Sequence, residues 1–435
     1  KRAPASQRPA LRWPLADGVL KVCESDQGIF TKSMDILTVV SVSCAVFAAY
    51  GEPSLQPARA PVADAQLCIA CDLGWAKMMG TWDPVTSLVT GVRDKSKSPP
   101  PPDAKNNLYP MYDHRPGGWG PPGVGDAPLI CGTALSGLVD KWEVTHDPTA
   151  KDDAAKLAQG VLNLAILHGY KGFVCRGFCN DGKTTVSLSS RDQYTHWVHG
   201  LWRYCTSSMA DPQIVKGYRE QIVEVAKFME TRVTAENQWN FGYADDSSKP
   251  DYRGICTMWG PEVWPHEAAR LPMIYVAAYM ATGDRHWKAL YEKYIDEALD
   301  ITLKAKHGGF QNKTPAQMQG RMPCYSLFQC VISFDPICAY EKNPQRRARI
   351  QEAMEVFAGF ARERQARAQR DPAYKPYGMC WDGELLLTQL MVPGFRPDEP
   401  FCRFLEDAVL REPLEKASLC RTAHILAAYW RSRRL

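Results

Sequence analysis

The fold is decided by the stretch Met273-Ile-Tyr-Val-Ala-Ala-Tyr-Met280, which is followed, after Gly283-Asp284, by residues 285–299. The first part is apolar on every side, as is typical of a helix that other helices enclose. After Asp284, apolar side chains recur at helical spacing and Lys and Glu occupy the remaining positions, which predicts a helix with one buried face. The stretch therefore predicts a hairpin of one inner and one outer helix.

The same pattern recurs from about residue 127 to residue 435. Each apolar helix is followed by a short polar connector in which Asp or Asn precedes the next helix, as expected of a helix N-cap and first turn. The connectors are His146-Asp-Pro148, Ala210-Asp-Pro212, Gly283-Asp284, Asn343-Pro344 and, more loosely, Arg396-Pro-Asp398. Inner helices surrounded by outer helices predict an all-α fold, closed into an (α/α)6 toroid of six hairpins.

The connections between helices differ in length. Inner-to-outer connectors are short, whereas the outer-to-inner connections span about 169–189, 233–264, 305–322 and 370–381. All long loops therefore lie at one end of the toroid, and long loops in a compact domain are usually functional. We expect the site at that end, over the first turns of the inner helices.

With this organisation the chain resembles the six-hairpin (α/α)6-toroid enzymes, which include glycoside hydrolases and polysaccharide lyases. The resemblance covers roughly residues 80–435 and is most specific at Ser189-Ser-Arg-Asp-Gln-Tyr-Thr-His196, which opens an inner helix, and around 259–271. It implies a carbohydrate substrate. The resemblance does not identify a catalytic pair of residues in this chain, since fold does not determine function.

The helix start at 190–203 is the first candidate site. Ser190 is a suitable N-cap, which places Arg191, Asp192 and Gln193 in the first turn, where a carboxylate gains from the helix dipole. One face of this helix carries Asp192, His196, His199 and Arg203. A carboxylate one turn from an imidazole could make it a general base or acid. The alternative is an ordinary helix cap followed by core histidines.

The second candidate is Met258-Trp-Gly-Pro-Glu-Val-Trp-Pro-His-Glu-Ala-Ala-Arg270. Pro265 suits a first helical position, which predicts that His266 and Glu267 lie in an opening turn. Two tryptophans beside carboxylates suit a sugar subsite with an acid and a base or nucleophile. The residues concerned are Trp259, Glu262, Trp264, His266, Glu267 and Arg270. The alternative is a packing motif capped by Glu267.

Further candidates complete the predicted rim. Asp113 and His114 lie in a Pro/Gly-rich stretch, Arg321 to Tyr325 opens one inner helix, and Trp381-Asp382-Gly-Glu384 opens another. Bidentate arginines at the rim would suit a uronate carboxylate or a sulfate. The arginines in question are Arg191, Arg253, Arg270 and Arg321.

These residues favour a glycoside hydrolase acting on an oligosaccharide or polysaccharide, including one that contains uronic acid. Asp192 and Glu262 or Glu267 would be the acid and base, with His196 and His266 assisting. Two alternatives remain open. One is a polysaccharide lyase, with His196, His266 or Tyr325 as the base, and the other is a non-catalytic carbohydrate-binding or scaffold protein.

Several absences narrow the function. The sequence has no phosphate loop, dinucleotide glycine fingerprint, His-Glu-x-x-His motif or Gly-x-Ser-x-Gly elbow. Cys68 and Cys71 form a Cys-x-x-Cys pair without a second pair at ligand spacing, so we expect neither a cofactor nor a metal. A net charge of +4 with scattered Lys and Arg does not indicate nucleic acid.

The first third of the chain is expected to differ from the rest. Residues 1–33 are basic and irregular and read as an upstream extension, and 34–51 resemble a signal peptide, which predicts a secreted or periplasmic protein without a membrane span in its mature form. A buried helix is the alternative for 34–51. Residues 52–126 are loop-rich and are expected to pack on a catalytic toroid of residues 127–435.

Overall fold

The computed structural model describes residues 64–90, 98–109, 125–245, 249–251, 253–307 and 322–435, all of them in the compact unit of residues 61–435. The predictions for residues 1–33 and 34–51, and those for Asp113, His114 and Arg321, fall outside this range. Secretion therefore stays a prediction. Among the described residues, no helix is both long and apolar enough to cross a membrane.

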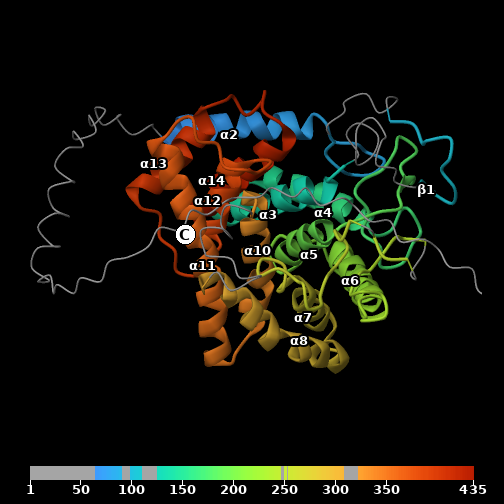
Figure 1. The fold of residues 1–435 in the computed structure, drawn as a ribbon. Helices are drawn as coiled ribbons and strands as arrows, with labels where there is room; N and C mark the ends of the chain where they lie inside the picture. Colours follow the sequence, from blue (N-terminus) through green and yellow to red (C-terminus); the bar gives the residue numbers. More distant parts are fainter. Residues whose placement is uncertain (1–63, 91–97, 110–124, 246–248, 252, 308–321) are drawn as a thin grey trace, which may run out of the picture. The chain divides into compact units, whose positions relative to one another are not determined.

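Regular structure in the described residues is mostly helical (Figure 1). The α-helices are α2 (Asp64–Met79), α3 (Ala127–Thr145), α4 (Pro148–Asn163), α5 (Arg191–Cys205), α6 (Pro212–Arg232), α7 (Arg270–Thr282), α8 (Arg285–Leu303), α10 (Cys324–Tyr340), α11 (Pro344–Arg370), α12 (Trp381–Leu390), α13 (Glu399–Leu410) and α14 (Leu419–Arg434). A short 3-10 helix, η3 (Lys304–His307), follows α8. Strands β1 (Leu108–Tyr109) and β2 (Thr185–Val186) pair in parallel.

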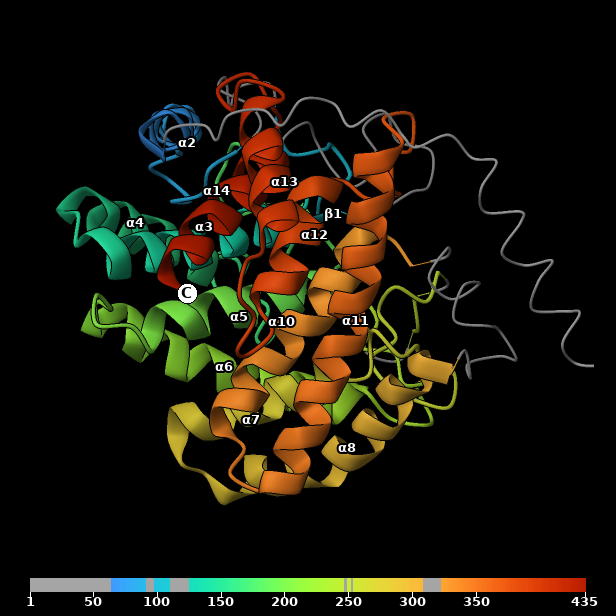
Figure 2. The same ribbon diagram turned by 90° about the vertical axis from the view of Figure 1, so that its left-hand side faces the viewer.

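Six helices form a closed ring. α3 packs against α5, α5 against α7, α7 against α10, α10 against α12, α12 against α14, and α14 returns to α3 (Figures 1 and 2). The other six lie outside: α4 on α3, α6 and α8 on α7, α11 on α10 and α12, and α2 and α13 on α14. Inner and outer helices alternate along the chain. The (α/α)6 toroid predicted from the sequence is confirmed.

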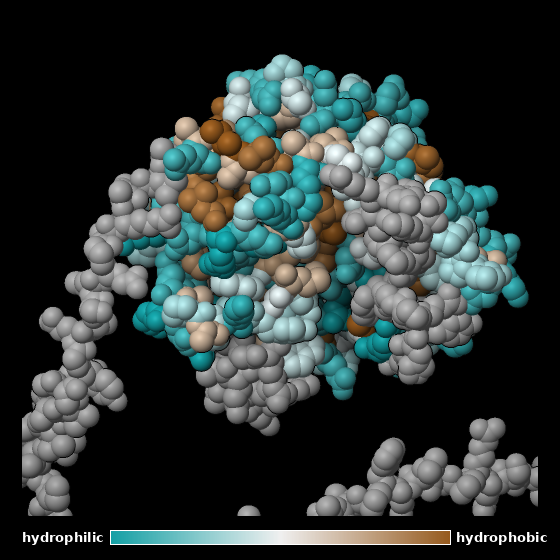
Figure 3. All heavy atoms as spheres, turned by 90° about the horizontal axis from the view of Figure 1, so that it is seen from above, coloured by the Kyte–Doolittle hydropathy of each residue, from teal (hydrophilic) through white to brown (hydrophobic). Residues whose placement is uncertain are grey.

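Helix α2 was not predicted, because 52–126 was taken as loop-rich. Its apolar side chains do not gather on one side: Leu67 and Cys71 are buried, whereas Ile69 and Leu73 are 60% and 51% exposed. Without one-sided periodicity the helix gives little signal in the sequence. Figure 3 looks onto the side of the molecule where α2 lies and shows hydrophobic patches on a mostly hydrophilic surface. Since α2 is the sixth outer helix, the toroid begins well before residue 127.

The polar connectors act as the helix caps that the sequence predicts. Asp147, Asp211, Asp284, Asn343 and Asp398 are the N-caps of α4, α6, α8, α11 and α13, and each side chain accepts a hydrogen bond from a backbone N–H of its first turn. Such a cap contributes about 1 kcal/mol to a helix. The short connectors therefore end one helix and begin the next within a few residues, which leaves the long loops at the opposite end.

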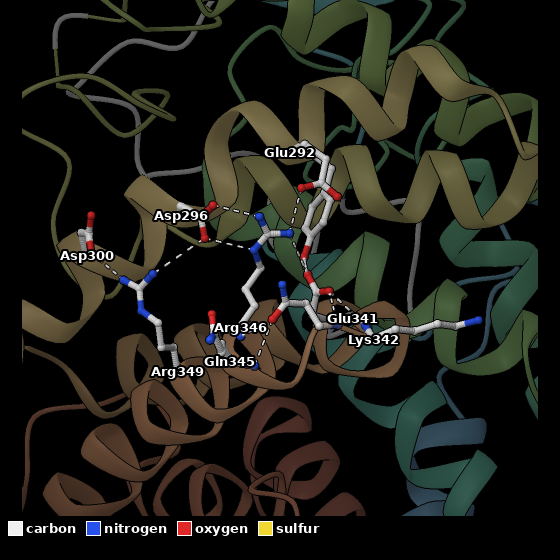
Figure 4. Close-up of polar contacts among 10 residues, drawn as sticks. Glu292, Asp296, Asp300, Glu341, Lys342, Gln345, Arg346 and Arg349 are labelled. Atoms are coloured by element: carbon white, nitrogen blue, oxygen red, sulfur yellow. Dashed lines mark hydrogen bonds and ion pairs between the residues drawn. The ribbon is translucent and has the colours of Figure 1, made fainter.

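Ion pairs join the outer helices near the short connectors. Arg346 of α11 binds Asp296 and Glu292 of α8, each at 2.8 Å, and Arg349 extends the network along α8 (Figure 4). Single exposed pairs contribute little to stability, but a network of several charges with bidentate geometry contributes more. This network holds α8 against α11.

Charged side chains also fill the ring interior at the short-connector end. Asp140 of α3 is 2% exposed and accepts hydrogen bonds from Arg203 at 2.6 Å, Arg434 at 3.1 Å and Arg431 at 3.4 Å. The three arginines come from α5 and α14, so a single carboxylate joins three inner helices. Arg203 therefore has a structural partner and lies away from the long loops.

Candidate functional site

A cavity of about 260 Å³ lies where α5, α7 and α10 begin, at the long-loop end. Its walls combine charged, aromatic and apolar side chains. They are Arg191, Asp192, Ile255, Trp264, His266, Glu267, Arg270, Met322, Pro323, Tyr325 and Ser326. Seven of the residues that the sequence analysis selected, from three separate segments, thus meet at one place.

Asp192 is the carboxylate most open to this cavity, with 30% of its side chain exposed. It lies in the first turn of α5, after Ser190, which occupies the N-cap position without a side-chain cap hydrogen bond. Its Oδ1 accepts a hydrogen bond from Arg270, which is 1% exposed and whose guanidinium also donates to Gln329 at 2.8 Å. The buried Arg270 therefore positions the carboxylate at the cavity wall.

Charge keeps Asp192 ionised. Burial would raise the pKa of this carboxyl, but Arg270 and then Arg191 outweigh burial and hold the pKa below its ordinary value. An ionised carboxylate at neutral pH can act as a base or a nucleophile but cannot donate a proton.

Two side chains, Arg191 and His266, contact the carboxylate of Glu267. Arg191 forms an ion pair with its Oε1, and His266 Nε2 lies 3.4 Å from the same oxygen. Burial opposes ionisation, but Arg191 and His266 lower the pKa of Glu267 well below its ordinary value. The other ring nitrogen of His266, Nδ1, is buried without a hydrogen-bond partner among the described residues. The pair therefore uses one imidazole nitrogen of His266 and leaves the other unpaired.

The helix start in this segment differs from the prediction. Residues 265–269 form turns rather than the first turn of a helix, and α7 begins at Arg270. Pro265 was expected at the first helical position, but α7 begins only at Arg270, and Pro272 is its third residue. Because proline lacks a backbone N–H, the first turn of a helix tolerates it best. His266 and Glu267 consequently lie in the loop before α7.

His196 lies below the cavity rather than in its wall. It is 2% exposed, and its ring nitrogens lie 3.1 Å from Thr133 Oγ1 and 3.4 Å from Gln329 Nε2. Burial, followed by the nearby His424, lowers its pKa well below the ordinary value, so the imidazole is neutral. Gln329 links it to Arg270, which makes His196 a positioning residue at most.

Four other candidates lie away from the cavity wall. Glu262 is exposed, and Trp259 is buried with its ring 4.8 Å from that of Tyr294. Gln193 donates to Asp126 at 2.7 Å. His199 is buried and pairs with Asp335 of α10 at 3.0 Å. Trp259 therefore packs inside the protein, which was the alternative for the segment 258–270. His199 is a core histidine, which was the alternative for the helix start at 190–203.

The start of α12 is also separate from this cavity. Asp382 is 2% exposed and pairs with Arg421 of α14 at 2.9 Å, so it joins two inner helices. Trp381 lies beneath Arg411, with the guanidinium 5.0 Å from its ring, and lines a different cavity. Both side chains were predicted to bind substrate, and neither lines the cavity between α5, α7 and α10.

Tyr325 and Gln329 complete the site from α10. Burial raises the pKa of Tyr325, and the charge on Asp192 raises it further, so the phenol stays protonated and can donate a hydrogen bond. Gln329, which the sequence analysis did not select, is fully buried between Arg270 and His196. Its signal was a polar residue in the middle of an otherwise apolar helix, which predicts a buried hydrogen bond.

No protein-family model matches this chain, and no curated protein matches it. Among solved structures, the chain is similar to an unsaturated glucuronyl hydrolase mutant from Streptococcus agalactiae, with 10% identity, a TM-score of 0.43 and coverage of 86% of this chain and 92% of that one. It is also similar to cellobiose 2-epimerase from Spirochaeta thermophila, with 12% identity, a TM-score of 0.42 and coverage of 82% and 84%. A third is a sugar epimerase from a ruminal bacterium, with 12% identity, a TM-score of 0.42 and coverage of 64% and 72%. The toroid is established by the chain's own helix contacts, and likeness at this level assigns no activity.

Proposed function

We propose that this protein is a glycoside hydrolase that acts on an oligosaccharide, with the cavity between α5, α7 and α10 as its active site. The observation that carries the proposal is the Asp192 carboxylate, which Arg270 holds ionised and which is open to a cavity that also contains Trp264 and His266. A fixed carboxylate, an imidazole and an aromatic face are the groups that a sugar subsite requires.

The environments of the side chains suggest their roles. Asp192 takes a proton from water as the water oxygen attacks the anomeric carbon. Glu267 is a poor acid because Arg191 and His266 keep it ionised. His266, oriented by Glu267, donates its proton to the glycosidic oxygen as the bond from that oxygen to the anomeric carbon breaks. Glu262, the other carboxylate considered for the acid, is exposed and outside the cavity lining.

The size and charge of the cavity point to a class of substrate. A volume of about 260 Å³ is slightly below the range of about 300–1,000 Å³ for small-molecule sites. It suits one terminal sugar ring better than a long polysaccharide. Arg191 and Arg270 line the cavity, and guanidinium groups bind carboxylates bidentately. We therefore expect a uronic acid residue to bind there, with its carboxylate at Arg191, whose side chain is 19% exposed and which Glu267 also binds.

A lyase is the second candidate, because His266 and Tyr325 lie in the same cavity. In that reaction His266 takes the C5 proton of a uronate while an arginine neutralises the carboxylate of the uronate. The bond to the leaving oxygen then breaks, and the hydroxyl of Tyr325 protonates that oxygen. The product carries a carbon–carbon double bond, which hydrolysis does not form.

The test uses a panel of uronic-acid-containing oligosaccharides and aryl uronides with the whole chain. Hydrolysis predicts new reducing ends without ultraviolet absorbance from an unsaturated uronide, whereas the appearance of that absorbance assigns the lyase. D192N should lower kcat by about 10²–10⁴-fold, and E262Q, which alters an exposed carboxylate outside the cavity, should retain activity. If D192N cleaves as fast as the unmodified protein, the site assignment is wrong. If glycans bind but none is cleaved, the protein is a carbohydrate-binding protein.

A further inference from the structure

Two cysteines and a histidine meet at a second place in the ring, where α12 and α14 begin. Cys380 directly precedes α12, and Cys420 and His424 lie one turn apart in α14. One possible ligand atom from each of the three lies within 4.8 Å of the others. Cys380 and His424 are 2% and 1% exposed. The glycoside hydrolase mechanism proposed above uses none of these residues.

We propose that Cys380, Cys420 and His424 bind one Zn²⁺ ion. Two thiolates and an imidazole are preferred ligands of zinc, which takes them in tetrahedral geometry. His424 Nδ1 lies 3.8 Å from Cys420 Sγ, which is close to the separation of two ligands around one tetrahedral zinc ion. The site does not depend on the proposed function, and it contradicts the expectation from the sequence that the chain binds no metal.

The local structure orients the ligands. His424 Nδ1 lies 2.8 Å from the carbonyl oxygen of Cys420, so the imidazole is held against the turn of α14 that carries this cysteine. Zinc would bind this nitrogen in place of its proton, since a histidine ligand is neutral, and the ring would keep its other proton on Nε2. Cys380 comes from the neighbouring inner helix, which packs against α14. The site is therefore assembled by the contact between two helices.

Glu384 gives an independent indication of a cation. It lies one turn after Cys380, is fully buried, and its Oε1 accepts a hydrogen bond from the backbone N–H of Cys380 at 3.1 Å. Its Oε2 is buried and has no hydrogen-bond partner among the described residues. A buried polar oxygen without a partner is costly, and a positive ion nearby would offset that cost. Glu384 would then be an outer-shell carboxylate that supports the ligand Cys380.

A zinc ion at this site would also be accessible from a cavity. Cys420 lines a cavity of about 530 Å³ between α2, α3 and α14. Three protein ligands leave the fourth position of a tetrahedral zinc ion for water or for an oxygen atom of a ligand, as in catalytic rather than structural zinc sites. The geometry thus favours an open zinc site over a closed structural one.

The first experiment uses the unmodified whole chain. After purification with a reductant and removal of metal, one equivalent of Co²⁺ should produce thiolate-to-cobalt charge-transfer absorption and intense tetrahedral ligand-field bands, which Zn²⁺ should displace. X-ray absorption of the zinc form should show two sulfur neighbours at about 2.3 Å and nitrogen or oxygen neighbours at about 2.0–2.1 Å. Zinc with only oxygen and nitrogen neighbours, or no zinc binding by the reduced protein, would overturn the proposal. A Cys380–Cys420 disulfide that yields no zinc-binding site after reduction would overturn it as well.

Variants then locate the ion. C420S and H424A should each remove the cobalt bands, and E384Q should weaken zinc affinity by about 10–100-fold, as loss of an outer-shell partner does. C402S alters an exposed cysteine of α13 outside the cluster, and C68S alters the Cys-x-x-Cys pair of α2, so both should bind zinc normally. Bands that survive in C420S and vanish in C68S would place the metal at α2 and refute the site. Thermal melting of each metal-free variant shows whether a loss of bands reflects unfolding.

Discussion

Replacement of Arg270 by Met tests the central interaction of the active site without any substrate. Arg270 is 1% exposed, and its guanidinium binds both Asp192 and Gln329. Because Met is apolar, R270M removes the charge from beside Asp192 while retaining a side chain of comparable length. Burial of Asp192 would then be opposed mainly by Arg191, so the pKa of Asp192 should rise.

The size and sign of the change in stability follow from the pKa of Asp192, because a pKa that differs between the folded and unfolded states makes stability depend on pH. In the unmodified protein the pKa of Asp192 lies below 3.8, so its contribution to stability is complete above pH 3.8 and is lost as the pH falls through the lowered pKa. A nearby opposite charge shifts a carboxyl pKa by about 1–3 units, and each unit corresponds to about 1.4 kcal/mol. Since 30% of the Asp192 side chain is exposed, we expect a cost of about 2 kcal/mol at pH 7. The free energy of unfolding that R270M removes should become smaller as the pH falls through the raised pKa of Asp192 in the variant.

Urea unfolding at neutral and at mildly acidic pH measures this cost in two backgrounds. With Asp192 present, R270M should cost more free energy of unfolding at neutral pH than at acidic pH. In D192N, which lacks the titrating group, R270M should cost the same at both values. An equal pH dependence in both backgrounds, or none in either, would refute the electrostatic account of this site.

Three further changes test the scaffold. D140A leaves the buried Arg203, together with Arg431 and Arg434, without their shared carboxylate and should cost about 3–5 kcal/mol in urea unfolding, whereas correctly folded D140A should retain its specific activity. A Cβ atom at Gly200 would lie 2.8 Å from the Cα of Gly132, so G200A should force α3 and α5 apart and cost about 1–3 kcal/mol; unchanged stability would contradict the close packing. D284A removes the side chain that accepts the N–H of His286 at 2.9 Å and should cost about 1 kcal/mol, a loss that D284N should largely restore if the cap is the cause.

Loop lengths and helix patterns predicted the fold and the end of the ring that carries the cavity. They sufficed because each hairpin repeats the same local features, namely an apolar inner helix, an acidic or amide cap and a one-sided outer helix. The cavity residues Asp192 and Tyr325 follow from the same argument, since first turns of neighbouring inner helices must meet at the long-loop end. His266 lies in the long loop before α7, which reaches the same end.

The remaining residues depended on partners that are distant in the sequence. Asp382 looked like a substrate-binding residue at a helix start, yet Arg421 in the last inner helix pairs with it. His199 shares a helix face with Asp192 but lies deeper, where Asp335 of α10 binds it. Cys380 precedes α12 and Cys420 lies in α14, and the approach of their side chains is visible only in three dimensions. The order of the hairpins predicts which inner helices are neighbours, but local patterns do not show which of their side chains face each other.

Closure of the ring also sets the order in which the two cavities can form. The contact between α3 and α14 joins segments separated by most of the toroid's length, so it can form only after the intervening helices have been synthesised. α5, α7 and α10, which surround the proposed active site, follow one another around the ring, and that cavity can take shape while the chain is still incomplete. The cavity at Cys420 lies between α2, α3 and α14 and arises only in the final step. A ligand that fills this cavity would therefore bind only the closed ring, and its binding would report on the completion of folding.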